Sequence, residues 1–498
     1  RDPKDVFIIG LGSGMTAGAA LTHPIARADV IEISPEVVAA SDFFKAENRN
    51  ALADPRTRLI VGDGRSHLSL ATKQYDVIIS EPSNPWIAGV SSLFTREFFQ
   101  SARARLAPGG VICQWVNAYN INDADLKSVI ATFRSVFPDG TVWLVGGDDV
   151  LLLATVEPLA DALSRLDARM SNATVAADLS SLGIVDAYSL RSLQQAGPAQ
   201  LASFAEGARV FTDDHLTLEF TAPRELHSPN AGKNGAALRR LNPSPSTATA
   251  TQLRHRAAML AKADHYEQAF DDYAAAVSAD PLDVAALDGL VTTAVILKKA
   301  DAALLQVRSS APPQNTVERQ VAISKLLAAS GDREAALSAA RDAVALAPQS
   351  PRGYEQLASL FADASDTVPL DAVVADLRKV APSHAATEFY SAVAAFLHGN
   401  AAEAVSHANR AIDLDPNYTA TYDLIGAALT KLAQVPLARQ AFEKSLSFNA
   451  HDSTAYENLG ILALNAGYRD VAVNYFAEAL WLDPGSQVAR QGLAQARR

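Results

Sequence analysis

The first half of the chain alternates short apolar runs with stretches of helix length. From Val6 to about Phe220 the apolar runs are VFIIGLG, ADVIEIS, TRLIVGD, YDVIISEP, GGVICQWV, GTVWLVGG and DVLLLATV. Apolar strands separated by helices are typical of a parallel sheet that helices cover on both faces. The pattern predicts an α/β Rossmann-like, doubly wound parallel sheet. We place its last strand at LTLEF, residues 216–220.

The second half is rich in alanine and repeats itself. Successive repeats end at Pro281, Pro313, Pro348, Pro382, Pro416, Ala450 and Pro484, with spacings of 32, 35, 34, 34, 34 and 34 residues. This period is the length of a tetratricopeptide repeat. In the last unit, Tyr456 and Gly460 on a first helix and Ala472 and Phe476 on a second alternate large and small residues, as two interlocking helices require. The sequence predicts an all-α solenoid of about seven repeats, most specifically in its last three units.

These patterns divide the chain into three parts. Residues 1–222 form the predicted α/β domain, residues 223–250 are rich in Pro, Gly, Asn, Ser and Thr and are predicted to be a linker, and residues 251–498 form the predicted solenoid. Such solenoids bind peptides or proteins along a concave face, and we expect a protein or peptide partner there. A spacer or oligomerisation arm is the alternative.

Charge and composition exclude some classes of function. The formal net charge of −12 disfavours a general nucleic-acid binder, so no nucleic-acid partner is expected. The single cysteine, Cys113, cannot form an intramolecular disulfide and is expected to be a buried strand residue. The apolar runs are far shorter than the roughly 20 residues that span a bilayer. We expect the cytoplasmic soluble portion of a longer protein, with membrane attachment only through a segment upstream of Arg1.

A glycine-rich turn follows the first predicted strand. Gly10, Gly12 and Gly14 form G-x-G-x-G at a strand-to-helix turn, where missing side chains let a ligand approach backbone N–H groups. Glu32 ends the second strand about 20 residues later and is placed to accept hydrogen bonds from both ribose hydroxyls. Asp63 ends the third strand and is placed to accept from an adenine amine.

The fourth predicted strand ends in the loop SEPSNPW, which begins with Ser80 and Glu81. Because the carboxyl ends of parallel strands meet at one edge of a sheet, Gly12, Glu32, Asp63 and Glu81 should converge on one crevice. The sequence therefore predicts a nucleoside site there. No zinc or Walker A spacing is present, so no metal is expected.

Taken together, these motifs resemble the spermidine synthase family, especially its bacterial branch fused to membrane segments. The likeness rests on IIGLGSG, VIEISPEVV, DPRTRLIVGDGR, YDVIISEPSNP, LFTREFF and LAPGGV, with FTDDHLTLEFTAPR as a closing motif, and covers about the first 220 residues. The resemblance implies a class I methyltransferase-like fold and transfer of an aminopropyl group from decarboxylated S-adenosylmethionine to putrescine. By resemblance, the three glycines would line the sulfur end of the donor, Glu32 would hold the ribose, and Asp63 with Gly64 the adenine.

Three departures from the family pattern fall on the chemistry. Where the family has Asp-Ser-Ser-Asp-Pro, this chain has Glu81, Pro82, Ser83, Asn84 and Pro85. Glu81 matches the family's catalytic Asp, which takes or orients the proton of the attacking ammonium group, and Asn84 removes a charge that would pair with a diamine. The family's Gly-Gly-Gly-Asp-Gly turn has Ser13 in place of the Asp that binds the terminal amine of the donor.

Three functions stay open on this basis. The first is a spermidine synthase-like transferase that uses S-adenosylmethionine or its decarboxylated form to alkylate a small amine acceptor, with Glu81 and Asn84 as catalytic residues. The second is an S-adenosylmethionine-dependent methyltransferase. The third is a catalytically inactive nucleoside-binding or scaffold protein that acts through its repeats.

Overall fold

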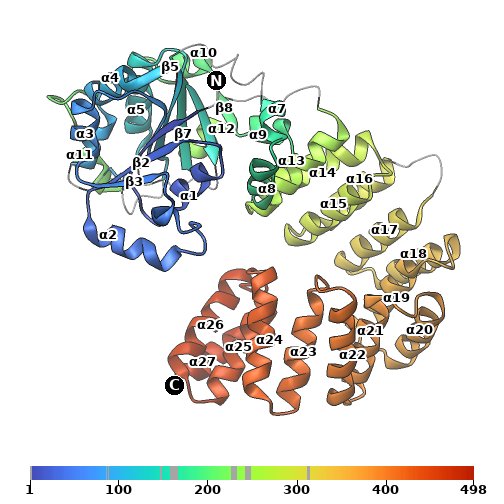
Figure 1. Cartoon of the computed structure of the whole chain (residues 1–498). Helices are drawn as coiled ribbons and strands as arrows, with labels where there is room; N and C mark the ends of the chain where they lie inside the picture. The colour runs from blue at the N-terminus through green and yellow to red at the C-terminus, as the bar shows by residue number, and fades with distance from the viewer. Residues whose placement is uncertain are drawn as a thin grey trace. The chain divides into compact units, whose positions relative to one another are not determined.

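The computed structural model of the chain describes residues 3–85, 87, 89–119, 121–145, 149–156, 166–225, 233–241, 248–310 and 315–497. The chain forms two compact units, Arg1–Ala279 and Asp280–Arg498. The first unit holds the sheet and the first helix pair, and the second holds the remaining helix pairs (Figure 1). Each unit is described here by itself.

An eight-stranded sheet forms the centre of the first unit, in the order β3-β2-β1-β4-β5-β7-β6-β8. Strands β1 to β5 pair in parallel, whereas β7 runs antiparallel to both β5 and β6, and β8 runs antiparallel to β6. The predicted Rossmann-like α/β fold is therefore confirmed, and its sheet is mixed beyond β5. The strands are β1 Asp5–Ile9, β2 Arg27–Glu32, β3 Thr57–Val61, β4 Tyr75–Ser80, β5 Leu106–Asn117, β6 Thr141–Val145, β7 Asp149–Thr155 and β8 Gln194–Ala196.

Alternate residues of β1 face opposite sides of the sheet, and both sides are buried. Phe7 and Ile9 belong to the larger core cluster, together with aromatic residues of α4 and α5. Val6 and Ile8 belong to a second cluster with Ala17 of α1. The β1 run is apolar throughout because it lies between β2 and β4 with helices on each face. The covering helices are α1 Met15–Leu21, α2 Pro35–Ala40, α3 Gly64–Leu70, α4 Arg96–Arg105 and α5 Asp123–Val136.

The strand predicted at LTLEF is wrong. Residues Leu218–Thr221 form the short helix α11, followed by a 3-10 turn at Ala222–Glu225. Leu218 and Ala222 are both fully buried, at the i, i+4 spacing of a helix, whereas Phe220 is 69% exposed. A strand would have placed residues 216, 218 and 220 on one face, so the helical spacing of the buried side chains decides the structure.

The first repeat helices belong to the compact unit that contains the sheet. Helix α13 (Ala250–Lys262) pairs with α14 (Tyr266–Ala279), and Arg256 of α13 makes a bidentate ion pair with the buried Asp272 of α14. His255 lies 2.6 Å from Asp186, the N-cap residue of α9 (Ala187–Arg191). The predicted linker lies partly outside the described residues, and its described part contains helix α12 (Lys233–Arg239).

The second unit is an array of antiparallel helix pairs, which confirms the predicted all-α repeat fold. Added Cβ atoms at Gly426 and Gly460 would lie 2.6 and 2.7 Å from the rings of Phe442 and Phe476, so glycine permits this helix contact. The pairs are α15 Val284–Ile296 with α16 Ala300–Ser309, α17 Val317–Ala329 with α18 Arg333–Leu346, α19 Pro351–Asp363 with α20 Thr367–Val380, α21 Ala385–Leu397 with α22 Ala401–Leu414, α23 Ala420–Lys431 with α24 Val435–Phe448, and α25 Ser453–Asn465 with α26 Arg469–Leu482, followed by α27 Gln487–Ala496.

Candidate functional site

The turn between β1 and α1 depends on glycine at three positions. Gly10, Gly12 and Gly14 have φ values of 93°, 52° and 82°, a region that residues with a side chain rarely adopt. A Cβ at Gly10 would lie 2.2 Å from the backbone oxygen of Glu81, so this glycine allows β1 and β4 to exit side by side. A Cβ at Gly12 would meet nothing within 4 Å. Gly12 therefore leaves open space above the turn.

Glu32 holds the glycine turn through its carboxylate. Its Oε2 accepts a hydrogen bond from the backbone N–H of Leu11 at 3.0 Å, and its Oε1 accepts from the N–H of Ser34 at 3.0 Å. The side chain is only 8% exposed. A carboxylate has about four lone-pair sites, so two sites are free to accept from hydroxyl groups of a ligand. The predicted ribose role is compatible with this second, structural role.

Glu81 lies on the other side of the same turn, directly after β4. Its backbone N–H donates to the carbonyl of Ile9 at 2.9 Å, and its Oε2 accepts from the hydroxyl of Thr16 at 2.5 Å. The side chain is exposed. The carboxylates of Glu32, at the end of β2, and Glu81, directly after β4, thus lie on either side of the turn that follows β1.

Asp63 and Gly64 lie at the exit of β3. The Oδ1 atom of Asp63 accepts from the N–H of Ser66 at 2.6 Å, so the side chain caps α3. Gly62 donates a backbone hydrogen bond to the carbonyl of Glu32 at 2.9 Å, which places this exit beside that of β2. Gly64 is buried, and a Cβ there would lie 2.7 Å from Ile9. Asp63 lies beside the end of β2, whereas Gly64 allows close packing of α3 on the sheet.

Asn48 supports the glycine turn and was not identified from the sequence. Its buried amide nitrogen donates to the carbonyl oxygens of Ser13 at 2.8 Å and Ser41 at 3.1 Å. The same side chain lies where a Cβ of Gly14 would be, and its backbone carbonyl lies against Gly18. Asn48 therefore fixes the backbone of Ser13, whose side chain is half-buried. No local sequence pattern marks such a contact over 35 residues.

Three buried side-chain oxygens near the end of β4 lack hydrogen-bond partners within the described part of the chain: Ser80 Oγ, Asn84 Oδ1 and Gln114 Oε1. Ser80 and Gln114 are fully buried and are direct partners across β4 and β5. Ser80 immediately precedes Glu81. The sequence signal was available, because Ser80 ends the apolar run of β4 and Gln114 lies within the apolar run ICQWV of β5. Unpaired buried acceptors are costly, and a ligand with N–H groups would satisfy them.

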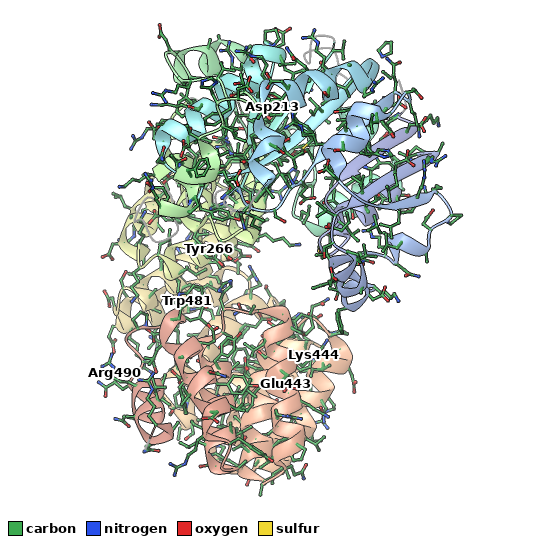
Figure 2. The ribbon with its side chains drawn as sticks, turned by 90° about the vertical axis from the view of Figure 1, so that its left-hand side faces the viewer. Asp213, Tyr266, Glu443, Lys444, Trp481 and Arg490 are labelled. Atoms are coloured by element: carbon green, nitrogen blue, oxygen red, sulfur yellow. The ribbon has the colours of Figure 1, made fainter. Side chains whose placement is uncertain are left out.

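Residues of the closing motif FTDDHLTLEFTAPR (211–224) contact the loop that follows β4 and α3 beside it. Asp213, labelled in Figure 2, forms an ion pair with Arg65 of α3. The same guanidinium donates to the carbonyl of Ser92 at 3.1 Å. The hydroxyl of Ser91 donates to Glu219 at 3.1 Å. Residues 90–94 are thus held by contacts with residues of the closing motif more than a hundred positions later, which gives FTDDH a structural role.

Cys113 lies on β5 opposite Ile79 of β4 and Leu153 of β7. Burial and the nearby charge of Glu81 raise the pKa of its thiol to about 12. A thiol with such a pKa is protonated at neutral pH and is a poor nucleophile, so its reactivity contributes nothing to the chemistry of the crevice.

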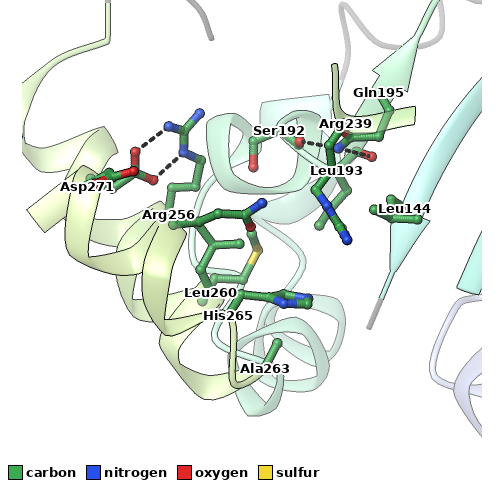
Figure 3. Close-up of a pocket in the computed structure, with 13 residues that line it drawn as sticks. Leu144, Ser192, Leu193, Gln195, Arg239, Arg256, Leu260, Ala263, His265 and Asp271 are labelled. Carbon is green, nitrogen blue, oxygen red and sulfur yellow. Dashed lines mark hydrogen bonds and ion pairs between the residues drawn. The ribbon is translucent and has the colours of Figure 1, made fainter. Parts of the chain in front are cut away.

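A separate cavity of about 230 Å³ lies between β6, residues 192–195 and the pair α13–α14. Leu144, Arg239 and His265 face this cavity, while the Arg256 guanidinium points to its partner Asp272 (Figure 3). None of the predicted site residues lines it.

The described residues contain neither a metal-ion group nor a membrane-spanning helix. No group of three or more His, Cys, Asp or Glu side chains is arranged to hold a metal ion there. No helix in the same residues has both the length and the apolar character needed to cross a membrane.

The spermine/spermidine synthase domain family matches residues 1–145. These residues form a spermidine synthase-like domain. Putrescine N-methyltransferase 2 of Nicotiana tabacum is 37% identical over 138 residues, covering 27% of this chain and 39% of that protein. The polyamine aminopropyltransferase of Nitrosomonas europaea is 27% identical over 183 residues, covering 34% of this chain and 55% of that protein.

The chain spans between about a third and somewhat more than half the length of these curated relatives. Among solved structures, a spermidine synthase in complex with the transition state analogue AdoDATO matches with 25% identity and a TM-score of 0.31, over 34% of this chain and 61% of that one. A tetratricopeptide-repeat protein of Thermus thermophilus matches with 20% identity and a TM-score of 0.33, over 36% of this chain and 99% of that one. The repeat assignment rests on the sequence period and the helix pairs themselves.

Proposed function

We propose that the spermidine synthase-like domain binds S-adenosylmethionine or its decarboxylated form and transfers an alkyl group to a small amine. The observation that carries the proposal is the pair of carboxylates, Glu32 and Glu81, that flank the open glycine turn. Glu32 would accept from the ribose hydroxyls, Asp63 from the adenine amine, and the turn would hold the sulfonium end of the donor.

In the proposed reaction, an uncharged amine attacks a carbon bonded to the sulfonium sulfur. A C–N bond forms, the C–S bond breaks, and the electron pair of that bond stays on the sulfur. The attacking nitrogen loses one proton, which Glu81 would accept or orient, because its carboxylate lies exposed beside the glycine turn. Asn84, Ser80 and Gln114 would offer uncharged acceptors to the N–H groups of the acceptor.

Methyl transfer is the second candidate, and two observations favour it. The relatives at 37% identity are named as putrescine N-methyltransferases. Ser13 stands where the spermidine synthase pattern has the Asp that binds the donor's terminal amine. Without that carboxylate, the terminal amine of the decarboxylated donor loses a charged hydrogen-bond partner, and the reason to prefer this donor is weaker.

Product analysis tests both candidates together. The whole chain is incubated with putrescine and with each donor separately, and the nucleoside product is identified by mass spectrometry. Aminopropyl transfer releases methylthioadenosine and methyl transfer releases S-adenosylhomocysteine. The proposal predicts one of these products with wild-type protein, reduced at least about 100-fold by Glu81→Gln. Absence of both with several diamines would favour a scaffold function.

The repeats have a function of their own in this proposal. We expect the solenoid to bind a protein or peptide partner, because stacked helix pairs present an extended surface.

A further inference from the structure

A cavity of about 610 Å³ lies in the second unit, among α19, α21 and the start of α23. These three elements come from successive repeats, and all ten lining residues are described. The volume is in the range of cavities that hold small ligands or peptide side chains. The lining residues include Ser359, Asp363, Phe389, Tyr390, Asn417 and Tyr418.

Aromatic rings form one wall of this cavity. The ring centroids of Phe389 and Tyr390 are 5.0 Å apart, and those of Phe389 and Tyr418 are 5.1 Å apart. Tyr390 is buried, whereas Phe389 and Tyr418 are half-buried, so the cluster is open on the side of the cavity. The face of an aromatic ring carries partial negative charge and attracts cations.

Helix α19 contributes Ser359 and Asp363 to the lining, on a face that also carries Glu355. Glu355, Ser359 and Asp363 follow one another at intervals of four residues and therefore share one face of this helix. The carboxylate of Glu355 has a buried oxygen, Oε1, that takes no hydrogen bond from the described chain, and the ring of His384 lies 3.4 Å from it. Burial raises the pKa of Tyr390, and the charges of Tyr418, Glu355 and Asp363 raise it further, so its phenol stays uncharged.

The carboxylate of Asp363 lies at an unfavourable position for a negative charge. Asp363 is the last residue of α19, and a negative charge at a helix C-terminus opposes the helix dipole. Its side chain is exposed at the cavity and forms no hydrogen bond or ion pair with the described part of the chain, and partial burial of the carboxyl raises its pKa. It is also the only lining residue of the cavity with a charged side chain. An accessible carboxylate without a protein partner, in the same lining as three aromatic rings, is available to pair with a cation from outside.

We propose that this aromatic-acidic cavity binds a lysine or arginine side chain of an extended peptide segment in a partner protein. The cation would lie against the rings of Phe389 and Tyr418 and pair with Asp363. The side-chain amide of the exposed Asn417 offers both a donor and an acceptor to the peptide backbone. This inference specifies the partner chemistry of the proposed repeat function and is independent of the transferase chemistry.

The test uses the whole chain and a fluorescein-labelled (Lys-Gly)5 peptide, with binding followed by fluorescence anisotropy at about 0.15 M salt in the absence of any donor nucleoside. The variant Asp363→Asn removes the proposed partner of the cation, and Phe389→Leu removes one ring. The matched control is Asp376→Asn, which removes one exposed negative charge that pairs with Lys379 on α20. Circular dichroism checks that each variant is folded, and Asp363→Asn should be, since it removes an unfavourable charge.

We expect Asp363→Asn and Phe389→Leu each to weaken peptide binding by about fivefold or more, and Asp376→Asn by less than about twofold. A peptide with every lysine acetylated should bind at least about tenfold more weakly, because the cation is lost. Equal effects of Asp363→Asn and Asp376→Asn, or no binding to wild-type protein, would overturn the proposal. Displacement of the peptide by micromolar spermidine would show that a free polyamine, not a peptide, is the occupant. Failure here leaves the transferase proposal untouched, because no donor is involved.

Discussion

The hydroxyl of Thr16 donates a 2.5 Å hydrogen bond to Oε2 of Glu81, although the two residues are 65 positions apart in the sequence. Thr16 belongs to the first turn of α1, and Glu81 is the first residue after β4. The bond therefore fixes the direction of an exposed carboxylate over the glycine turn. It also shows how the chain accommodates a glutamate, one methylene longer than the aspartate of the spermidine synthase pattern: the extra reach places the carboxylate beside α1.

This relationship predicts the effect of removing the charge of Glu81. Glu81→Gln keeps the size and the hydrogen bond to Thr16 but cannot accept a proton. We expect kcat to fall by roughly 100-fold or more, while donor affinity changes by less than about threefold. The control Glu47→Gln removes an exposed carboxylate in a turn outside the site and should leave both quantities unchanged. Turnover and donor affinity are measured on the same preparations, and unchanged turnover in Glu81→Gln would remove this residue from the mechanism.

Gly10 and Gly12 have different roles in the same turn: Gly10 permits close packing, and Gly12 leaves space for a ligand. Alanine variants at the two positions should therefore have different effects. Gly10→Ala would place a Cβ 2.2 Å from the Glu81 carbonyl in a backbone with φ of 93°, and should destabilise the fold by about 3 kcal/mol. Gly12→Ala meets open space, so only the backbone strain of about 1 kcal/mol applies. Its methyl group would instead obstruct a nucleoside. Urea denaturation should thus identify Gly10→Ala as the unstable variant, and calorimetry should identify Gly12→Ala as the weak binder; equal stability of the two would contradict the packing argument.

Restoring a carboxylate at position 13 tests the preference of the site for one donor over the other. Ser13→Asp reinstates the carboxylate of the spermidine synthase turn close to the N-terminus of α1, where negative charge is favourable. A charge-assisted hydrogen bond to the donor's amine contributes about 1.5 to 3 kcal/mol, so preference for decarboxylated over intact S-adenosylmethionine should rise by roughly tenfold or more. Ser13→Asn is the uncharged control. If the ratio of the two dissociation constants is the same in both variants, Ser13 does not face the amine of the donor.

Asp423 gives the repeats a dependence on pH. Burial and the neighbouring Asp452 raise the pKa of this carboxyl from 3.8 to about 7, and its Oδ1 is buried without a hydrogen bond from the described chain. Because the folded-state pKa is the higher one, the folded chain holds an extra proton between about pH 4 and pH 7. The resulting stability is fully present below about pH 4 and is lost as the pH rises through about 7.

Asp423→Asn should remove this loss. We expect the variant to be more stable than the wild type at about pH 8, by on the order of 1 kcal/mol, and no more stable at about pH 4. Urea denaturation at the two pH values measures the difference. The same slope of stability against pH in both proteins would rule out Asp423 as the titrating group.

The sequence predicted those features that depend on local pattern. Apolar runs revealed the strands, and the residues that follow them, Gly12, Glu32 and Glu81, could be assigned to one edge because parallel strands end together. The 34-residue period revealed the helix pairs because each repeat buries the same positions. LTLEF was misread since three apolar residues at alternate positions fit a strand, and only tertiary packing shows that Leu218 and Ala222 are the buried pair.

Features that depend on distant contacts could not be predicted in this way. Asn48 and Thr16 act through single hydrogen bonds across 35 and 65 residues, and nothing in the local sequence distinguishes them from surface residues. The same holds for the ion pair of Arg65 with Asp213. The pair α13–α14 follows the repeat pattern yet lies in the same compact unit as the sheet, with His255 bound to Asp186. Experiments on the domain should therefore use the whole chain.

The central claim is that the edge formed by the glycine turn, Glu32 and Glu81 is a working nucleoside site. Isothermal titration calorimetry of the whole chain with S-adenosylmethionine, its decarboxylated form and methylthioadenosine tests it most directly. We predict micromolar binding of at least one of the three, weakened about tenfold or more by Glu32→Gln, because one amide hydrogen would then face the N–H of Leu11 or Ser34. Absence of binding by all three nucleosides at millimolar concentration would contradict the account.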